Sequence, residues 1–140
     1  MPNLSLSVLF EFAASHRLYR PDLSEQENHK LFGKCSNPNG HGHNYTLTVN
    51  VSGPVDTTTE MIIDASLLKE VVEREVLQDV DHKDLNRDTP WLEGRVPTTE
   101  VLAHAIFERL ALAVSEASGT ARLDSVTLQE TRRISVTVTR

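Results

Sequence analysis

The sequence predicts an α+β fold in the order ββααββ, with a four-stranded antiparallel sheet and two helices on one face of it. Three observations lead to this expectation. Two N-terminal and two C-terminal segments alternate apolar and polar residues, as half-buried strands do. Two segments between them carry apolar residues at helical spacing. The 140 residues contain no repeat, low-complexity tract or linker, so we expect a single domain over 1–140.

The first two strands are predicted over residues 4–12 and 45–51, where every second residue is apolar. The apolar positions are Leu4, Leu6, Val8, Phe10 and Phe12 in the first strand and Tyr45, Leu47, Val49 and Val51 in the second. The intervening residues 17–40 are rich in polar side chains and are predicted to form a long loop. Loops of that length in a compact domain are usually functional.

Two helices are predicted in the middle of the chain. Asp64 is suited to cap a helix over about residues 65–78. A second helix is predicted from near Thr98 to about residue 115, and Gly119 follows its end.

The last two strands are predicted near the C-terminus, again from alternation. Their apolar positions are Val126 and Leu128 in one strand and Ile134, Val136 and Val138 in the other. Neither the first nor the last strand carries the lysines or internal proline that usually protect a sheet edge. We therefore expect other subunits of a homo-oligomer to occupy the edges.

Composition excludes several classes of function. The net charge is −6 and no basic stripe is present, so a nucleic-acid partner is not expected. No apolar run approaches the length of a membrane helix, and the N-terminus lacks the cationic start of a signal peptide. The single cysteine cannot form an intrachain disulfide. A cytoplasmic location is therefore expected.

Three histidines fall on the buried side of their strands. Extending the buried parity of the first strand past Phe12 reaches His16, and extending that of the second strand backwards reaches His43 and His41. Three converging imidazoles would form a zinc site with a fourth position open to water or substrate. The alternative is a set of buried histidines with ordinary hydrogen bonds, and the in-register third histidine favours zinc.

Cys35 precedes His41 by six residues, across a Pro-Asn-Gly turn that can fold the thiol back towards the metal. A free cysteine is more often an inert small hydrophobic residue. A polar loop beside Lys34 and a metal would instead favour a reactive thiolate, and we prefer that interpretation.

Two acidic positions have open interpretations. Asp81 and His82 form a surface turn or, beside a thiolate and a metal, a proton-carrying pair. Glu130 inherits the buried parity of its strand. It is either a frayed strand end in solvent or an acceptor for an NH-rich ligand.

Four stretches of the sequence carry a family resemblance that extends over nearly the whole chain. They are FAASHRLYRPDLSEQENHKLFGKCSNPNGHGHNY, DHKDLN, PTTE and the Gln-Glu-Thr around Glu130. With these motifs the chain resembles the 6-pyruvoyl-tetrahydropterin synthase family. Five residues separate Cys35 from His41, as in the pyruvoyl enzymes, whereas the related 6-carboxytetrahydropterin synthases of the queuosine pathway usually have three.

The resemblance implies the tunnelling fold, in which three subunits join their sheets into a barrel and two trimers stack into a hexamer with sites at subunit interfaces. It also implies residue roles. The expected zinc ligands are His16, His41 and His43; the expected general base is Cys35, with Asp81 and His82 completing a proton relay; and the expected pterin-binding residues are Glu130, Thr98, Thr99 and Glu100.

The activity implied is a zinc-dependent lyase reaction that converts 7,8-dihydroneopterin triphosphate to 6-pyruvoyl-tetrahydropterin with loss of triphosphate. One alternative on the same fold is a 6-carboxytetrahydropterin synthase or an enzyme that cleaves the substrate side chain. A non-enzyme alternative is a pterin- or zinc-binding oligomer. The chain departs from the family pattern at Ser36 and Val101, where Asn is commoner, and at Asp84 and Asn86, which exchange the commoner Asn and Asp.

Overall fold

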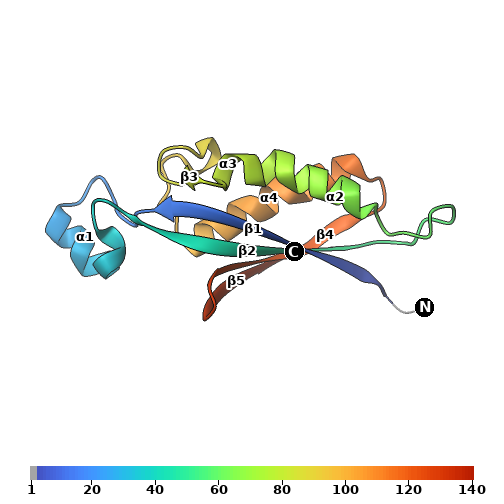
Figure 1. The fold of residues 1–140 in the computed structure, drawn as a ribbon, viewed down its shortest axis with the longest axis horizontal. Coiled ribbons are helices and arrows are strands. Elements are labelled where there is room, and N and C mark those ends of the chain that lie inside the picture. The colour runs from blue at the N-terminus through green and yellow to red at the C-terminus, as the bar shows by residue number, and fades with distance from the viewer. Residues whose placement is uncertain (1–2) are drawn as a thin grey trace.

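The computed structural model describes residues 3–140, and these residues contain a five-stranded sheet in the order β3-β1-β2-β4-β5 (Figure 1). The strands are β1 (Ser5–His16), β2 (His41–Ser52), β3 (Lys83–Asp84), β4 (Arg122–Thr131) and β5 (Ile134–Thr139). The four predicted strands are present and pair antiparallel. The predicted count of four was wrong by one, because β3 adds a parallel pair beside β1. A strand of two residues has no alternation by which a sequence could reveal it.

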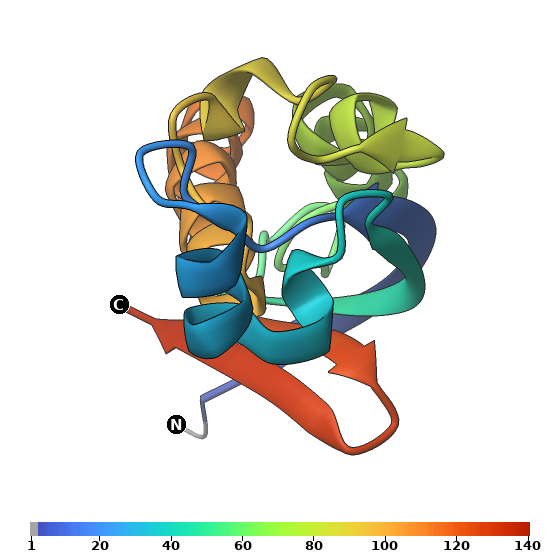
Figure 2. The same cartoon turned by 90° about the vertical axis from the view of Figure 1, so that its left-hand side faces the viewer.

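The helices cover one face of this sheet. Helix α2 (Ala65–Val72) continues through a π-helical turn, η2 (Glu73–Leu77), into α3 (Gln78–Val80), and α4 (Thr99–Ala117) follows a short 3₁₀ turn, η3 (Pro90–Leu92). Figure 2, which views the molecule from one end, shows α2 and α4 side by side above the strands. Both predicted helices are therefore confirmed. None of the helices in residues 3–140 combines the length and apolar character that crossing a membrane requires.

The core lies between the sheet and these helices. The inward side chains of β2 are fully buried at Tyr45, Leu47, Val49 and Val51. They pack in one cluster with the apolar stripes of α2 and α4. The outward face is polar, and the amide of Asn50 is hydrogen-bonded both to Ser7 on β1 and to Ser125 on β4. This two-sided pattern is the alternation that predicted the strands.

Residues 17–40, predicted as a loop, contain a helix and a turn: α1 (Glu25–Phe32) and the 3₁₀ turn η1 (Gly33–Ser36). The loop prediction was wrong there because α1 buries no apolar stripe; its one buried residue is Asn28. The Asn28 amide donates to the carbonyl oxygens of Arg20, Leu23 and Ser24 and accepts from the Arg20 N–H. Ser24 and Glu27 form a capping box. Polar contacts thus fold a segment that apolar periodicity cannot detect.

Candidate metal centre and active site

The histidine cluster is built by the pairing of β1 with β2. These strands pair without a register shift, so His16 lies opposite His41 and Ala14 lies opposite His43. Gly42 between the two histidines fits this close pairing, because a Cβ there would lie 3.3 Å from the Ala14 carbonyl oxygen. Ring nitrogens of His16, His41 and His43 all lie within 4.8 Å of one another. The three rings therefore converge, as strand parity predicted, in a cluster that could hold a metal ion.

A backbone carbonyl group orients the His16 ring. Its Nδ1 lies 2.8 Å from the Pro97 carbonyl oxygen, and its Nε2 lies 3.1 Å from the Nε2 of His41. When Nδ1–H donates to Pro97, Nε2 keeps a lone pair that faces the cluster, which is the tautomer a metal ligand requires. Ligands held tetrahedrally at about 2.0–2.1 Å from zinc lie about 3.3 Å apart. The spacing of these two nitrogens is close to that value.

Burial favours the neutral form of His16 and His41. The pKa of His16 is lowered chiefly by burial, although the carbonyl of Pro97 opposes the shift, and the pKa of His41 is also lowered chiefly by burial. Neutral imidazole is the metal-binding form. Within residues 3–140 the Nε2 of His43 is buried and has no hydrogen-bond partner. Because an unpartnered buried nitrogen is costly, this donor set fits a metal ion.

Glu130 closes one side of the cluster. Its Oε1 lies 3.4 Å from the Nε2 of His43, and its Oε2 accepts a short hydrogen bond from the Thr99 hydroxyl. A register shift occurs between Gln129 and Thr131, where β4 meets β5. Glu130 is therefore held against the site and is not a frayed strand end. An ionised carboxylate has about four lone-pair sites, so Glu130 can accept hydrogen bonds beyond the one from Thr99.

The other two residues of the PTTE stretch are not joined to the cluster. The Thr98 hydroxyl accepts from the Val101 N–H and so caps α4. Glu100 is exposed in the first turn of that helix. Sequence reasoning missed the role of Pro97, which acts through its backbone carbonyl and so has no side-chain signal.

Tyr45 lies beneath the histidines. Its ring is stacked on Phe12 at 4.9 Å between centroids and packs edge-on against His43 at 5.7 Å. Its hydroxyl is buried and has no hydrogen-bond partner within the described residues. Burial raises the pKa of this hydroxyl, with Glu130 adding to the shift, so Tyr45 stays neutral. The alternation of residues 45–51 predicts Tyr45 as a buried strand position, and its burial is confirmed.

Cys35 lies in the 3₁₀ turn η1 and is partly exposed. In the described part of the chain, the group of converging metal-ligating side chains comprises the three histidines and does not include this thiol. The turn is tied to the end of β1, because the Leu18 N–H donates to the Cys35 carbonyl oxygen at 2.8 Å. A backbone hydrogen bond thus connects the Cys35 turn to the end of the strand that carries His16, and the thiol lies outside the histidine cluster.

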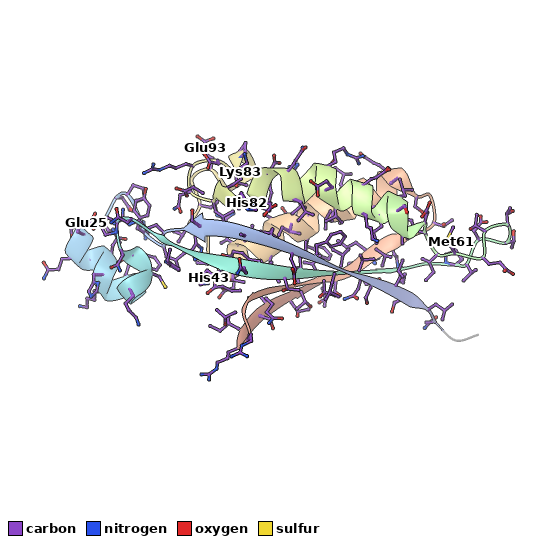
Figure 3. The ribbon with its side chains drawn as sticks, viewed as in Figure 1. Glu25, His43, Met61, His82, Lys83 and Glu93 are labelled. Carbon is purple, nitrogen blue, oxygen red and sulfur yellow. The ribbon has the colours of Figure 1, made fainter. Side chains whose placement is uncertain are left out.

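Asp81 and His82 lie at the outer edge of β1. Asp81 Oδ1 is 2.9 Å from His82 Nδ1 and accepts from the Ala13 N–H at 3.0 Å. His82 has a positive φ of 61° and an 82% exposed side chain. Figure 3 shows His43 on β2 and His82 beyond the neighbouring strand β1. Within one chain the pair is therefore formed, but at the sheet edge and not in the cluster.

The fold and the cluster together define a class of protein. It is an α+β protein whose sheet carries a cluster of three histidines that could hold a metal ion, with a carboxylate beside it. Comparison with known proteins narrows the class. The sequence model of "6-pyruvoyl tetrahydropterin synthase" matches residues 5–140. The chain therefore belongs to the 6-pyruvoyl tetrahydropterin synthase family, and it is an enzyme of the lyase class.

Three known proteins are similar to this chain in sequence or structure. The 6-pyruvoyl tetrahydrobiopterin synthase of Homo sapiens is 50% identical over 105 residues, which are 75% of this chain and 72% of that protein. The structure of 6-pyruvoyl tetrahydropterin synthase from Caenorhabditis elegans superposes with a TM-score of 0.89 at 38% identity, covering 100% of this chain and 97% of that one. The 6-carboxy-5,6,7,8-tetrahydropterin synthase of Bacillus subtilis is 31% identical over 80 residues, which are 56% of this chain and 51% of that protein. The fold is thus the tunnelling fold of the pyruvoyl family.

Proposed function

We propose that this enzyme is a zinc-dependent lyase that converts 7,8-dihydroneopterin triphosphate to 6-pyruvoyl-tetrahydropterin with loss of triphosphate. The observation that carries the proposal is the three-histidine cluster with Glu130 against its open side. The 50% identity to the human protein supports the pyruvoyl reaction. The five-residue spacer between Cys35 and His41 supports the same assignment.

The proposed metal ligands are His16, His41 and His43. Three neutral imidazoles with an open fourth position form a catalytic type of zinc site, and a fourth protein ligand would instead indicate a structural one. Bound zinc would act as a Lewis acid at the side-chain hydroxyls of the substrate, which acidifies the adjacent C–H bonds. The Pro97 carbonyl would hold the His16 ring in the required tautomer.

The proposed pterin anchor is Glu130. One carboxylate group can accept hydrogen bonds from both an amino group and a ring N–H, and the pterin ring presents these donors side by side. The Thr99 hydroxyl fixes Oε2 of this carboxylate and so orients it. Thr98 and Glu100 are proposed to line the pterin pocket, Thr98 while also capping α4.

The proposed proton carriers are Cys35, Asp81 and His82. As thiolate, Cys35 would accept a proton from the substrate side chain, and His82, oriented by Asp81, would pass protons to and from the site. The exposed position of His82 at the sheet edge supports a site completed between subunits. We infer that the relay pair and the thiol act in one site within the assembly.

The assembly is proposed to be a homohexamer, a dimer of trimers whose sheets join into a barrel. Within residues 3–140, β3 covers only Ala14 and Ser15 on the outer edge of β1, and β5 forms the other edge. Leu9 and Ile134, both on these edge strands, are 66% and 53% exposed. Open edges with exposed apolar side chains favour strand pairing with another copy. Sedimentation at micromolar concentration tests this, and a monomer would contradict it.

Product analysis tests the reaction. The zinc-loaded enzyme is incubated with 7,8-dihydroneopterin triphosphate, and triphosphate and 6-pyruvoyl-tetrahydropterin are expected. Acetaldehyde together with 6-carboxytetrahydropterin would instead establish the carboxy-forming alternative. A hydroxymethyl pterin would establish side-chain cleavage.

The Cys35→Ala variant separates catalysis from binding. It should keep zinc and pterin binding and lose turnover, because the thiol is the proposed base and not a ligand. Undiminished turnover would remove Cys35 from the mechanism. Loss of zinc would indicate a closed Cys-His₃ structural site, as the non-enzyme alternative requires.

A further inference from the structure

Residues 81–86 run along the outer edge of β1. They are hydrogen-bonded to every second residue of that edge, at Ala13, Ser15 and Arg17. The His82 N–H donates to the Ala13 carbonyl oxygen at 2.6 Å, and the Leu85 N–H donates to the Ser15 carbonyl oxygen at 2.8 Å. At the start of the segment, the Asp81 carboxylate accepts from the Ala13 N–H. A side chain thus takes the place of a backbone partner where β3 has not yet begun.

At the C-terminal end of this segment, the Asn86 side chain also takes the place of a backbone partner. Its Oδ1 accepts from the Arg17 N–H at 2.7 Å, and its Nδ2 donates to the Arg17 carbonyl oxygen at 2.9 Å. A primary amide offers one donor and one acceptor side by side, as a peptide group does. Asn86 therefore extends the strand pairing one step beyond β3, onto the residue that follows the ligand His16.

Arg17 in turn holds the turn that carries the cysteine. Its Nε donates to the Ser36 carbonyl oxygen at 2.8 Å, and its backbone neighbour Leu18 donates to the Cys35 carbonyl oxygen. The guanidinium also pairs with Glu25 and lies over the ring of Tyr19 at 4.0 Å. The Arg17 side chain is only 15% exposed, which fits a fixed position and not a mobile one.

We propose that Asn86 is a positioning residue of the active site: its amide fixes the Arg17 backbone, and through Arg17 it fixes the Cys35 turn relative to His16. This inference rests on the proposed function, because it assigns the same thiol and ligand. Asn86 stands where the family more often has Asp. A carboxylate there would keep the acceptor for the Arg17 N–H but would have no donor for the Arg17 carbonyl.

Three variants test the proposal in the full-length zinc-loaded enzyme. Asn86→Ala removes both hydrogen bonds and Asn86→Asp retains one. Arg87→Ala is the matched control in the same turn, because the Arg87 side chain is 83% exposed and, among the described residues, makes only a 3.8 Å ion pair with Asp84. Each variant is compared in kcat and KM per zinc-loaded site, and in the rate at which iodoacetamide alkylates Cys35, the chain's single cysteine.

The expected result is graded. Asn86→Ala should lower kcat by about 10- to 100-fold with little change in KM, as loss of supporting contacts does at metal sites. Its thiol should be alkylated faster than in the wild type, because the turn is less restrained. Asn86→Asp should fall between Asn86→Ala and the wild type in both readouts, and Arg87→Ala should match the wild type.

Two results would overturn the proposal. One is a wild-type kcat and alkylation rate in Asn86→Ala. The other is a loss of turnover that disappears when activity is divided by the folded, zinc-loaded fraction, since that would make Asn86 merely structural. A wild-type enzyme without lyase activity would defeat the proposed function instead. The alkylation comparison needs no substrate and would still decide the role of Asn86.

Discussion

His16 is held by the residue just before the N-cap of α4: the Pro97 carbonyl oxygen lies 2.8 Å from the Nδ1 of His16. Thr99, two residues further, donates its hydroxyl to Glu130. The segment that begins α4 therefore orients both a proposed metal ligand and the proposed pterin anchor. Displacement of this segment would disturb both groups at once.

Metal binding should depend on each of the three histidines. In His43→Ala the zinc content should fall from about one ion per chain to near zero, because two imidazoles do not complete a catalytic type of site. Elemental analysis after dialysis measures this. His104→Ala is the control, since His104 is 60% exposed and, within residues 3–140, forms an ion pair only with Glu108. Full zinc occupancy in His43→Ala would contradict the proposed ligand set.

Pterin affinity should depend on the charge of Glu130. Glu130→Gln should weaken the binding of neopterin to the zinc-loaded protein by about 10- to 100-fold, because a hydrogen bond to a charged group contributes about 1.5–3 kcal/mol. Thr99→Val, which removes only the orienting hydroxyl, should have a smaller effect in the same direction. Fluorescence titration gives both constants. Equal affinity in Glu130→Gln and wild type would exclude the anchor role.

Removal of the Tyr45 hydroxyl should not destabilise the protein. A buried hydroxyl without a partner costs about 1–3 kcal/mol, and Tyr45→Phe removes it while keeping the ring against Phe12 and His43. The free energy of unfolding should therefore stay the same or rise by about 1 kcal/mol. Urea unfolding of the metal-free protein tests this. A clear loss of stability would indicate that a bound water or ligand satisfies the hydroxyl.

The metal-free protein should become less stable in mild acid. Burial lowers the pKa of His16 and of His41 below the ordinary value of 6.5, so near that value the unfolded chain binds protons that the folded chain does not. The free energy of unfolding should therefore fall as the pH drops through 6.5, and the fall should continue until the folded histidines titrate. Above pH 6.5 both histidines should be neutral in the folded and the unfolded chain, so they should cause no further change in the free energy of unfolding.

Urea unfolding in the presence of a chelator, from pH 8 to pH 5.5, measures the slope. His16→Asn should reduce it, because one of the two depressed groups is gone. Stability that increases between pH 7 and pH 6 would be the opposite of the expected sign.

Gly40, the residue just before β2, should not tolerate a side chain. Its φ is 70°, and a Cβ would lie 2.9 Å from the backbone oxygen of His16. The left-handed conformation alone costs about 1–2 kcal/mol for another residue. Gly33→Ala, with a φ of 59°, a ψ of −135° and no atom within 4 Å, should show only the cost of its own backbone conformation, and Gly119→Ala, where nothing lies within 4 Å, should be near neutral. Thermal unfolding of the three variants ranks them, and an equal effect at Gly40 and Gly119 would exclude the close contact.

The elements with strong periodicity could be predicted from the sequence, and so could the convergence of the histidines. That convergence followed from strand parity alone, because β1 and β2 pair without a bulge. Strand β3 and helix α1 could not be predicted, since a two-residue pair and a helix organised around Asn28 leave no apolar pattern.

The contacts that support the candidate site also could not be predicted from the sequence. Pro97 meets His16 across 81 residues of chain, and Asn86 meets Arg17 across 69. The spacing of apolar residues predicts which side chains share a face of one helix or strand. It does not predict contacts between separate elements, because these depend on how the elements pack. Asp81 and His82 could be proposed as a proton relay from their residue types, but their position at the sheet edge could be known only from the fold.

Residues 17–40 leave the sheet after His16 and re-enter it at His41, and these two residues are direct partners in the β1–β2 ladder. The excursion is thus closed at its base by two proposed ligands. Because the entropy of closing a loop changes slowly with its length, residues can be gained or lost there without disturbing the ladder. In evolution, the thiol could be moved relative to the three-histidine cluster while the cluster itself stayed unchanged. Such a scaffold would let the reaction outcome diverge without any change in the proposed metal ligands.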